Sequence, residues 1–338
     1  MARFQHHGRF GRFAVCLAVL LCCGSAAAQT PTHSTGSGQA YPVKPVRLIV
    51  PYVPGGGSDT IARGVGSGLS ERLGQPFVVE NRGGANTIIG TEYVANQPPD
   101  GYTLLLCTGS LATNQSLYKL KYDSVKSFTP IGLMLWGSQL LVVHPSLPVK
   151  NVKELIAFGR ANPGKLTYTS YGTGSPAHLA GELFASMAKV DMLHIPFKGS
   201  SPALIEVVSG RALMTFGVMV PTLPLVKSGK LRPLAVASPK RNPSYPEWPT
   251  IAEAGLPGYE AQGFNGICGP AGMPRDIVMK LNTALSDFLS AKETREKFLA
   301  LGFNMLEKPT SPEEFGTVIR TQTEKWAKVI KTAGIKLE

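Results

Sequence analysis

The sequence predicts an α/β protein with two lobes, each a mostly parallel β-sheet flanked by helices. Short apolar runs typical of buried strands alternate with segments of helical periodicity along most of the chain. This alternation is the pattern of a parallel sheet with helices on both faces. It occurs in two series, and extended segments at residues 131–143 and 261–268 connect them. The chain is therefore expected to leave lobe 1, build lobe 2 and return through two crossover segments.

Residues 1–28 have the composition of a secretory signal peptide. A basic start, MARFQHHGRFGR, precedes the apolar run FAVCLAVLLCC and a stretch of small residues that ends at Ala28. The apolar run is shorter than the roughly 20 residues that cross a bilayer, which argues against the alternative of a membrane anchor. Residues 29–40 are small and polar and predict a flexible lead-in. Export by this peptide would place the mature protein in the periplasm.

Lobe 1 is predicted to comprise residues 41–138 and 264–338. Turn residues such as Gly74 and Pro76 end the elements of its first series. The predicted strands of this series are 46–53, 77–80 and 102–107, and the predicted helices are 61–73 and 87–95. Further helices are predicted at 275–289, 293–301 and 313–332. These last three helices are expected to cover lobe 1.

Lobe 2 is predicted to comprise residues 139–263, where the second series has the same character. Pro163 and Gly164 end its first helix, and glycine-rich loops follow its strands. The predicted helices are 152–162, 177–187 and 202–209, and the predicted strands are 166–170, 194–197, 212–216 and 231–237. Two lobes with a crevice between them form an architecture that can close on a ligand.

The charge of the chain favours small anions as partners. Lysine and arginine outnumber aspartate and glutamate by 34 to 22, which gives a formal net charge of +12. The basic residues are scattered, without a run of five or six, and export argues against a nucleic-acid partner. A generally basic surface without a specific partner is the alternative.

Two of the five cysteines, Cys107 and Cys268, lie beyond the expected signal peptide. Each occupies an apolar run, LLLCT or GICGP, where buried free cysteines are common. Neither belongs to a C-x-x-C pair. We therefore expect two inert core thiols, and a disulfide in the oxidising compartment is the alternative.

Several strand-to-helix junctions carry the same chemistry. In open α/β sheets ligands bind where a strand ends and the next helix begins. Glycine at these places lets a ligand approach the backbone, and serine or threonine offers a hydroxyl group. The first N–H groups of a helix are unpaired and carry partial positive charge, so each junction can bind an anion. These junctions are residues 55–59, 108–110, 171–176, 198–202 and 217–221.

Each of several side chains near the junctions can be interpreted in two ways, as a ligand-binding group or as a structural one. Asp59 is expected to cap its own helix, and binding an amino group of the ligand is the alternative. His178 can hydrogen-bond the ligand or the loop, or be structural. Lys198 can attract a carboxylate, or be solvated. Four aromatic residues can wall the crevice or fill the cores, namely Tyr52, Tyr171, Phe216 and Phe264.

The motifs of common enzymes are missing from the sequence. The glycines at 64, 66 and 68 fall inside a predicted helix and not between strand and helix, which a dinucleotide fingerprint requires. There is no Walker-type phosphate loop and no G-x-S-x-G elbow. His33, His144, His178 and His194 lack the spacing of a metal helix. We therefore expect a binding protein with no catalytic residues, no metal and no cofactor.

Seven stretches of the chain resemble the Bug/TctC family, the extracytoplasmic solute receptors of tripartite tricarboxylate transport. They occur in the family's order from about Tyr41 to the C-terminus. The stretches are YPVKPVRLIVPYVPGGGSDTIAR, LSERLGQPFVVENRGGANTIIG, PPDGYTLLL, NPGKLTYTSYGTGSPAHLAGELF, HIPFKGSSPAL, SGKLRPLAVASPKRNPSYPEWPTIAEAGLPGYEA and GPAGMPRDIVMKLN.

The resemblance implies a periplasmic-binding-protein fold of the Venus flytrap kind with no catalytic activity. Members of the family bind small carboxylates, including dicarboxylates and tricarboxylates, acidic amino acids and aromatic acids. The implied partners are such a ligand and the integral membrane subunits of the transporter, and the protein is expected to be a monomer. The loops 52–59 and 170–178 are expected to hold the ligand carboxylate, largely through backbone N–H groups and water.

The ligand-binding residues expected from the junctions and the resemblance come from both lobes. They are Tyr52, Gly55, Gly56, Ser58, Asp59, Asn86, Thr108, Ser110, Ser170, Tyr171, Gly172, Thr173, His178, Lys198, Gly199, Phe216, Gly217 and Phe264.

The sequence departs from the family pattern at two places. It reads MTFGVM where many members read MMFDN, so Gly217 replaces an acid that can meet a ligand amino group, which argues against an amino-acid ligand. It reads RGGANT at another turn, which places Asn86 near the crevice. With Val218 and Met219 also apolar, the pocket is expected to favour a carboxylate with an apolar or aromatic body.

Two functions other than transport stay open at this point. The same fold can deliver a ligand signal to a membrane kinase. A periplasmic hydrolase would use His178 with a nearby serine.

Overall fold

The computed structural model describes residues 41–335 of the 338-residue chain. The expected signal peptide at 1–28 and the expected lead-in at 29–40 lie outside the described residues. Within residues 41–335, no helix combines the length and the apolar character that a bilayer span requires.

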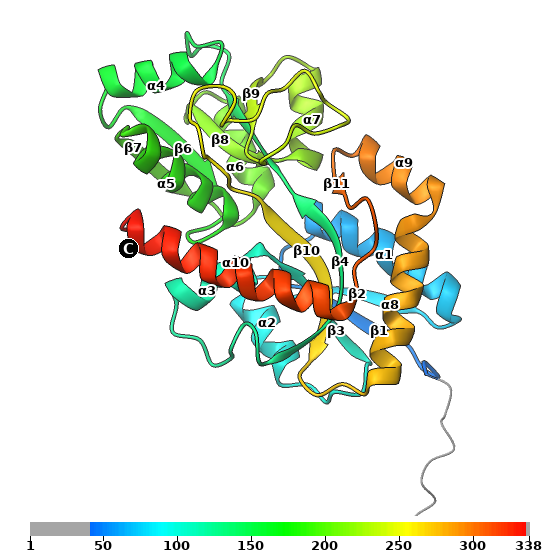
Figure 1. The fold of residues 1–338 in the computed structure, drawn as a ribbon. Helices are drawn as coiled ribbons and strands as arrows, with labels where there is room; N and C mark the ends of the chain where they lie inside the picture. Colours follow the sequence, from blue (N-terminus) through cyan, green and yellow to red (C-terminus); the bar gives the residue numbers. More distant parts are fainter. Residues whose placement is uncertain (1–40, 336–338) are drawn as a thin grey trace, which may run out of the picture. The chain divides into compact units, whose positions relative to one another are not determined.

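Lobe 1 is built on a six-stranded sheet with the order β11-β4-β10-β3-β1-β2 (Figure 1). Strand β1 pairs in parallel with β2 and β3, whereas β10 pairs antiparallel with both β3 and β4. The strands are β1 (Val46–Val50), β2 (Phe77–Asn81), β3 (Thr103–Thr108), β4 (Phe128–Gly137), β10 (Gly263–Pro270) and β11 (Asn304–Met305). Every residue of β3 is buried, because helices cover both faces of the sheet at this strand.

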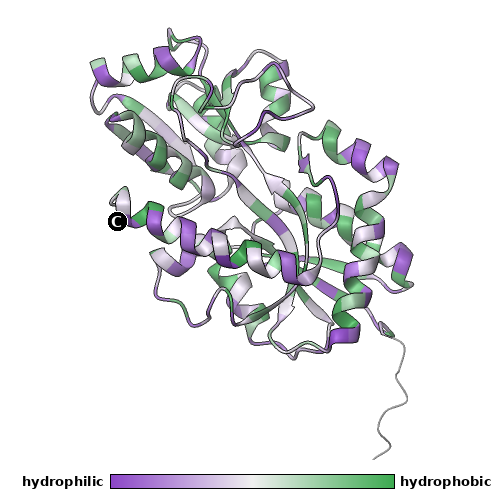
Figure 2. Cartoon of the chain, in the orientation of Figure 1, coloured by the Kyte–Doolittle hydropathy of each residue, from purple (hydrophilic) through white to green (hydrophobic). Residues whose placement is uncertain are grey.

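The helices of lobe 1 pack closely on this sheet and on one another. A Cβ atom at Gly68 of the first helix would collide with the ring of Phe288, so this glycine allows two helices to approach. The helices are α1 (Gly57–Leu73), α2 (Ile88–Ala95), α3 (Gly109–Leu117), α8 (Arg275–Ser290), α9 (Lys292–Ala300) and α10 (Pro312–Thr332). Hydrophilic and hydrophobic residues alternate along α8 and α10, as expected for helices with one face on a core (Figure 2).

Lobe 2 is built on a five-stranded sheet with the order β7-β6-β8-β5-β9. Strand β6 pairs in parallel with β7 and β8, and β5 pairs antiparallel with β8 and β9. The strands are β5 (Gln139–Val143), β6 (Leu166–Ser170), β7 (Met192–Pro196), β8 (Met214–Val218) and β9 (Arg232–Val236). The helices are α4 (Val152–Ala161), α5 (Pro176–Ala188), α6 (Ser200–Val208) and α7 (Met219–Lys227).

Two crossover segments connect the lobes, as predicted. Strand β4 of lobe 1 continues through Ser138 into β5 of lobe 2, and the chain returns through β10 (Figure 1). The strand that enters each lobe from the other, β5 in lobe 2 and β10 in lobe 1, is antiparallel to both of its neighbours. Most of the remaining strands in each sheet point in one direction. The predicted two-lobed α/β fold with mostly parallel sheets and two crossovers is therefore confirmed.

Helix α7 was not among the predicted elements. Its sequence, MVPTLPLVK, contains Pro221 and Pro224, and proline usually argues against a helix. Pro221 lies in the first turn, where its missing N–H needs no partner, so only Pro224 disturbs the helix. Strand β11 and helix α3 were also not predicted, and α1 begins four residues earlier than expected, at Gly57 instead of Ile61.

The C-terminal helix packs on lobe 1 and also contacts lobe 2, and the second contact was not expected. Phe315 and Ile319 pack in the core of lobe 1. Trp326 and Ile330, further along α10, pack in the core of lobe 2, and Ile335 joins them. Figure 1 shows α10 ending near α5 of lobe 2. The helix is long enough, at 21 residues, to reach both cores.

The expectation of two free thiols is wrong, because Cys107 and Cys268 form a disulfide with a Cα–Cα distance of 6.1 Å. The two residues lie on adjacent antiparallel strands, β3 and β10. Cys107 is opposite Gly266 and Cys268 is opposite Leu105, so the cysteines are diagonal neighbours. The two positions are 161 residues apart in the sequence, and only the return of the chain to lobe 1 brings them together.

Candidate functional site

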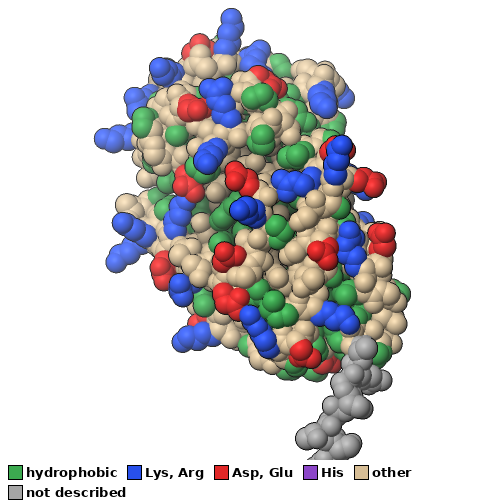
Figure 3. Space-filling model, turned by 45° about the vertical axis from the view of Figure 1, so that its right-hand side comes forward, with side chains coloured by type: hydrophobic (Ala, Val, Ile, Leu, Met, Phe, Trp, Pro, Cys, Tyr) green, Lys and Arg blue, Asp and Glu red, His purple; other side chains and the backbone are tan. Residues whose placement is uncertain are grey.

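A cavity of about 210 Å³ lies between the lobes and is lined by residues from both. The crossover residues Ser138 and Gln139 form part of its wall, so the pocket lies beside the connection between the sheets. None of the described residues that line it carries a charge. The outer surface is different, because basic and acidic side chains are interspersed over the face in Figure 3.

Five helices begin at this pocket. Residues at the starts of α1 and α3 line it from lobe 1, and residues at the starts of α5, α6 and α7 line it from lobe 2. Four of these helices have no hydrogen bond from an N-cap side chain, and their N-cap residues are Gly56, Thr108, Gly199 and Val218. Their first N–H groups are therefore left for another acceptor. Such N-termini favour negative charge, so the pocket is suited to an anion.

The start of α5 differs from the other four. The side chain of Ser175 accepts a hydrogen bond of 3.4 Å from the backbone N–H of His178, which caps the helix. Pro176, the first helical residue, lines the pocket but has no N–H to offer. Helix α5 therefore supplies the wall of the pocket and not a donor.

Two tyrosines from opposite lobes face each other at the polar end of the pocket. The rings of Tyr52 and Tyr171 lie 6.4 Å apart, edge to face. The Tyr52 hydroxyl is 2.9 Å from Oγ of Ser110 and 3.2 Å from Oγ1 of Thr108. Burial raises the pKa of both tyrosines above the ordinary value. Both hydroxyl groups therefore keep their protons at neutral pH and can donate hydrogen bonds.

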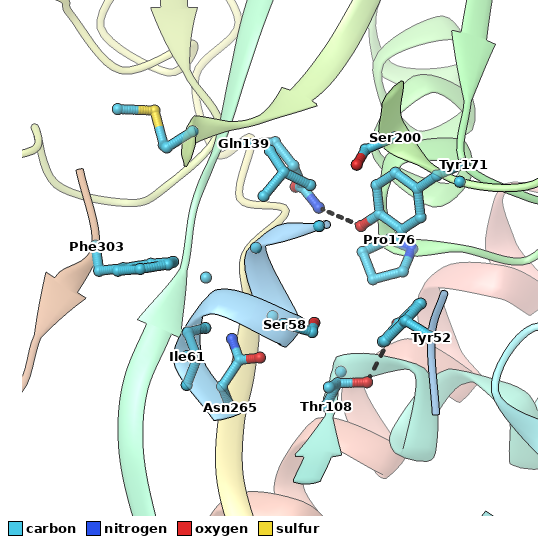
Figure 4. Close-up of a pocket in the computed structure, with 18 of the residues that line it drawn as sticks. Tyr52, Ser58, Ile61, Thr108, Gln139, Tyr171, Pro176, Ser200, Asn265 and Phe303 are labelled. Atoms are coloured by element: carbon cyan, nitrogen blue, oxygen red, sulfur yellow. Dashed lines mark hydrogen bonds between the residues drawn. The ribbon is translucent and has the colours of Figure 1, made fainter. Parts of the chain in front are cut away.

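Gln139 is a buried amide in the pocket wall, and its side-chain carbonyl oxygen has no hydrogen-bond partner among the described residues. Only 5% of the residue is exposed. Its Nε2 atom donates to the hydroxyl of Tyr171 over 3.4 Å, as Figure 4 shows. A buried polar atom without a partner costs free energy, so we expect this oxygen to accept a hydrogen bond from a ligand or a water molecule.

The opposite side of the pocket is mainly apolar. Figure 4 shows Phe303 and Ile61 on this side, with the amide of Asn265 beside Ile61, and Tyr52 and Tyr171 on the other side. A Cβ atom at Gly57 would lie 2.8 Å from Cγ1 of Val218 and 4.0 Å from the ring of Phe303. A Cβ atom at the preceding residue, Gly56, would instead lie 3.7 Å from Oγ of Ser200. At the start of α1, Gly57 therefore faces the apolar side of the pocket and Gly56 faces the polar side.

Asp59 supports the loop before α1 and does not line the pocket. Its carboxylate accepts hydrogen bonds from the backbone N–H of Gly55 at 3.1 Å and from Arg63 and Asn81 at 3.0 Å each. Burial alone would raise its pKa, but these hydrogen bonds outweigh burial, and the pKa lies below its ordinary value. The expected capping role is corrected in part, because the N-cap position belongs to Gly56.

Two histidines of lobe 2, His178 and His194, belong to an internal cluster. Nδ1 of His178 accepts a hydrogen bond of 3.0 Å from the backbone N–H of Gly174, and its ring stacks on His194 at 4.1 Å. Nε2 of His194 lies 2.7 Å from Oγ of Ser170. None of these three side chains lines the pocket. His178 therefore holds the glycine loop, and this pairing of serine and histidine does not face the space that a substrate would occupy.

Seven of the expected ligand-binding residues line the pocket together. They are Tyr52, Gly56, Ser58, Thr108, Tyr171, Gly199 and Phe264. The others lie outside the lining, and they are Gly55, Asp59, Asn86, Ser110, Ser170, Gly172, Thr173, His178, Lys198, Phe216 and Gly217. Ser110 still acts on the pocket, through its hydrogen bond to Tyr52.

The positions of three residues outside the lining explain why they do not face the pocket. Lys198 is exposed to solvent. Phe216 is fully buried in the core of lobe 2, so it fills a core and does not wall the crevice. A Cβ atom at Gly217 would collide with Oγ1 of Thr222, so the packing of α7 against β8 accounts for this glycine.

Asn86 is hydrogen-bonded within lobe 1 and also touches the glycine loop of lobe 2. Its Nδ2 atom donates to Oδ1 of Asn114 at 2.7 Å, and Asn114 donates back to the Asn86 carbonyl oxygen. A Cβ atom at Gly174 of lobe 2 would lie 2.9 Å from the Asn86 amide, so the two loops touch. The hydroxyl of Tyr118 donates to the carbonyl oxygen of Thr173 at 2.9 Å and completes this contact.

Some lining residues could not be found by inspecting strand-to-helix junctions. Gln139 and Asn265 lie in the crossover segments, where a polar residue inside an apolar run was the available signal. Phe303 follows α9 in a loop without any local pattern. Ser200 lies within the expected junction 198–202 but was not singled out.

Comparison with known proteins identifies relatives over most of the chain. The family model described as "Tripartite tricarboxylate transporter family receptor" (TctC) matches residues 61–335. Protein BugT of Bordetella pertussis is 34% identical over 305 residues, which cover 89% of this chain and 93% of BugT.

Two solved structures have the same fold. The R. palustris protein Rpa4515, solved with adipate, is 39% identical with a TM-score of 0.83, and the match covers 88% of this chain and 99% of Rpa4515. The periplasmic binding protein BugD is 34% identical with a TM-score of 0.82 and coverages of 88% and 100%.

Proposed function

This chain belongs to the TctC family of tripartite tricarboxylate transporter receptors, and we propose that it captures a small carboxylate in the periplasm and delivers it to the membrane subunits of such a transporter. One observation carries the proposal, namely the uncharged pocket at which four helices from both lobes begin without a side-chain cap. In this proposal lobe 1 comprises residues 41–138 and 264–338, and lobe 2 comprises residues 139–263. The receptor acts as a monomer and catalyses no reaction.

A carboxylate matches this arrangement of donors. The N-terminus of a helix carries roughly half of a positive charge, so several N-termini around one cavity attract an anion although no basic side chain lines it. The hydroxyl groups of Tyr52 and Tyr171 add donors at the polar end. Among the described residues that line the pocket, no acid opposes the ligand charge. Hydrogen bonds from N–H groups to a charged oxygen are about twice as strong as those between neutral groups.

Capture would proceed by closure of the two lobes. The starts of α1 and α3 offer donors on lobe 1, and motion about the crossover segments brings the starts of α6 and α7 of lobe 2 onto the ligand. Interactions between the lobes then help to hold the closed form, among them the hydrogen bonds from Tyr118 to Thr173 and from Asn242 Nδ2 to the carbonyl oxygen of Gly302 at 2.9 Å. The closed form is the state expected to dock on the membrane subunits.

The relatives support a carboxylate as the ligand class. Rpa4515, at 39% identity, was solved with adipate, a dicarboxylate. The expected ligand-binding residues that line the pocket here come from the loops 52–59 and 170–178, from two further junctions at Thr108 and Gly199, and from strand β10 at Phe264. Residues behind this lining, such as Asp59 and His178, are proposed to hold the loops in place.

Native mass spectrometry of the purified protein, followed by calorimetry on the ligand-free form, tests the proposal. We expect an organic acid to co-purify and to bind with one-to-one stoichiometry. Ligand at 100 times its dissociation constant should stabilise the fold by about 2.7 kcal/mol in a thermal-shift assay. The proposal would be abandoned if no member of a broad carboxylate panel bound, or if the bound acid were chemically converted.

A further inference from the structure

We infer that the ligand of this receptor is a carboxylate with an apolar body and without an ammonium group. The inference rests on the proposed function and narrows its ligand class. It excludes amino acids, and it excludes acids such as citrate that carry charged or hydroxyl groups along the whole of their length.

The first argument is that the pocket has no counter-charge for an ammonium group. No described lining residue is acidic. Asp59, at the start of α1, has its oxygens engaged by Gly55, Arg63 and Asn81. The helix N-termini around the cavity repel a cation as strongly as they attract an anion. An ammonium group would therefore be buried without a partner, which proteins avoid.

The second argument is the chemistry of the far end of the pocket. Ile61, Met219 and Phe303 line it and are buried, with exposed fractions of 2%, 2% and 5%. The side chain of Val218 also reaches this end, because it approaches Gly57. These four side chains offer no hydrogen-bonding group to a hydroxyl or a carboxylate, and the amide of Asn265 beside Ile61 is the polar side chain that Figure 4 labels on this side. A ligand segment that lies against them gains most when it consists of methylene or aromatic carbon.

The third argument is that both lobes fix this apolar wall. Asn242 of lobe 2 is fully buried and donates a hydrogen bond of 2.9 Å to the carbonyl oxygen of Gly302, next to Phe303. A Cβ atom at Gly302 would lie 3.0 Å from Cε of Met219, so α7 packs against the same turn. The wall is therefore complete only when the lobes are together. It selects the ligand at the step of closure.

Calorimetry with matched acids tests the inference. One arm uses unbranched monocarboxylates and α,ω-dicarboxylates of four to eight carbons. In the series that binds, each methylene that reaches the wall should raise the affinity by up to about fourfold. The second arm compares hexanoate with 6-aminohexanoate and glutarate with glutamate. Each amine-bearing acid should bind at least about 100-fold more weakly than its partner.

Variants at the wall assign the effect to this end of the pocket. Phe303→Asn should flatten the dependence on chain length, whereas the matched control Phe303→Leu should keep it. Val218→Asp should reduce the difference in affinity between glutarate and glutamate, because the new carboxylate is a counter-charge for the ammonium group. The inference fails if affinity does not rise with chain length, or if glutamate binds as tightly as glutarate. If no carboxylate binds at all, the proposed function fails instead.

Discussion

The hydroxyl of Tyr118 in the segment after α3 donates a hydrogen bond of 2.9 Å to the backbone carbonyl oxygen of Thr173, and this bond joins lobe 1 to the glycine loop of lobe 2. Neither residue lines the pocket. In the proposed closure, this bond would help to hold the closed form without touching the ligand. A receptor whose affinity depends on closure should be sensitive to its loss.

Tyr118→Phe should weaken ligand binding without changing the pocket. A hydrogen bond of this kind contributes about 0.5–1.5 kcal/mol, so calorimetry should show a loss of affinity of roughly 2- to 10-fold. Tyr259→Phe is the matched control, because the Tyr259 hydroxyl also donates to a backbone carbonyl oxygen, that of Ala180, but within lobe 2. The control should lower stability and leave affinity unchanged. Equal losses of affinity in both variants would show that Tyr118 has no special part in closure.

Two adjacent glycines should respond differently to alanine. A Cβ atom at Gly57 would lie 2.8 Å from Val218 of the opposite lobe, and the stiff Val218 side chain cannot move away cheaply. Overpacking of this kind costs about 1–3 kcal/mol, so Gly57→Ala should weaken binding by about 5- to 150-fold. Gly56→Ala meets Ser200 at an ordinary contact distance of 3.7 Å, so it should lower the affinity less than Gly57→Ala does, although Gly56 also lines the pocket. Titration calorimetry of the two variants measures this difference. Equal affinities would contradict the close contact between Gly57 and Val218.

His194 should make the protein less stable in mild acid. Burial, and then the neighbouring His178, lower the pKa of His194 to about 3, whereas an unfolded histidine titrates near 6.5. Between these values the unfolded chain binds one more proton, so the free energy of unfolding falls as the pH decreases from about 6.5 towards 3. The slope is at most about 1.4 kcal/mol per pH unit, and solvent screening at the partly exposed ring reduces it.

Urea unfolding of wild type and His194→Gln between pH 4 and pH 7 measures this dependence. The variant should show a flatter profile. His144→Gln is the control, because His144 hydrogen-bonds Ser146 away from the cluster, and it should keep the wild-type slope. Parallel profiles for wild type and His194→Gln would rule out His194 as the source of the acid sensitivity.

The disulfide between Cys107 and Cys268 should stabilise lobe 1 considerably. It closes a long loop, since 161 residues separate the two cysteines, and loss of such a bridge costs about 2–5 kcal/mol. A reducing agent should therefore lower the urea midpoint of the wild type and leave the Cys107→Ala/Cys268→Ala double variant unaffected. A midpoint of the wild type that does not respond to complete reduction would contradict the expected stabilisation.

Local chemistry made much of this fold and part of the site predictable. Strands and helices alternate with clear turn residues, so most elements were found within a few residues of their observed bounds. The junction loops were predicted because glycine, serine and proline have the same local purpose wherever a strand meets a helix. Tyr52, Ser58, Thr108 and Tyr171 came from this reasoning, and they line the pocket.

The features that the sequence did not predict depend on contacts between distant segments. Phe303 becomes a wall of the pocket only because Asn242 and α7 hold its turn. Cys107 meets Cys268 only because β10 returns to lobe 1 between β3 and β4. Helix α10 reaches the second core because of its length and direction. None of these relationships leaves a periodic or local signal in the sequence.

The attraction of the pocket for negative charge is tested most directly by comparing acids with their neutral amides. Calorimetric titration of ligand-free protein with an acid that binds, and with the amide of the same carbon skeleton, isolates the charge, because the two molecules have almost the same shape. Uncapped helix N-termini from both lobes predict that the acid binds at least about 10-fold more tightly than the amide. Equal affinity for acid and amide would contradict a carboxylate receptor built on these helix starts.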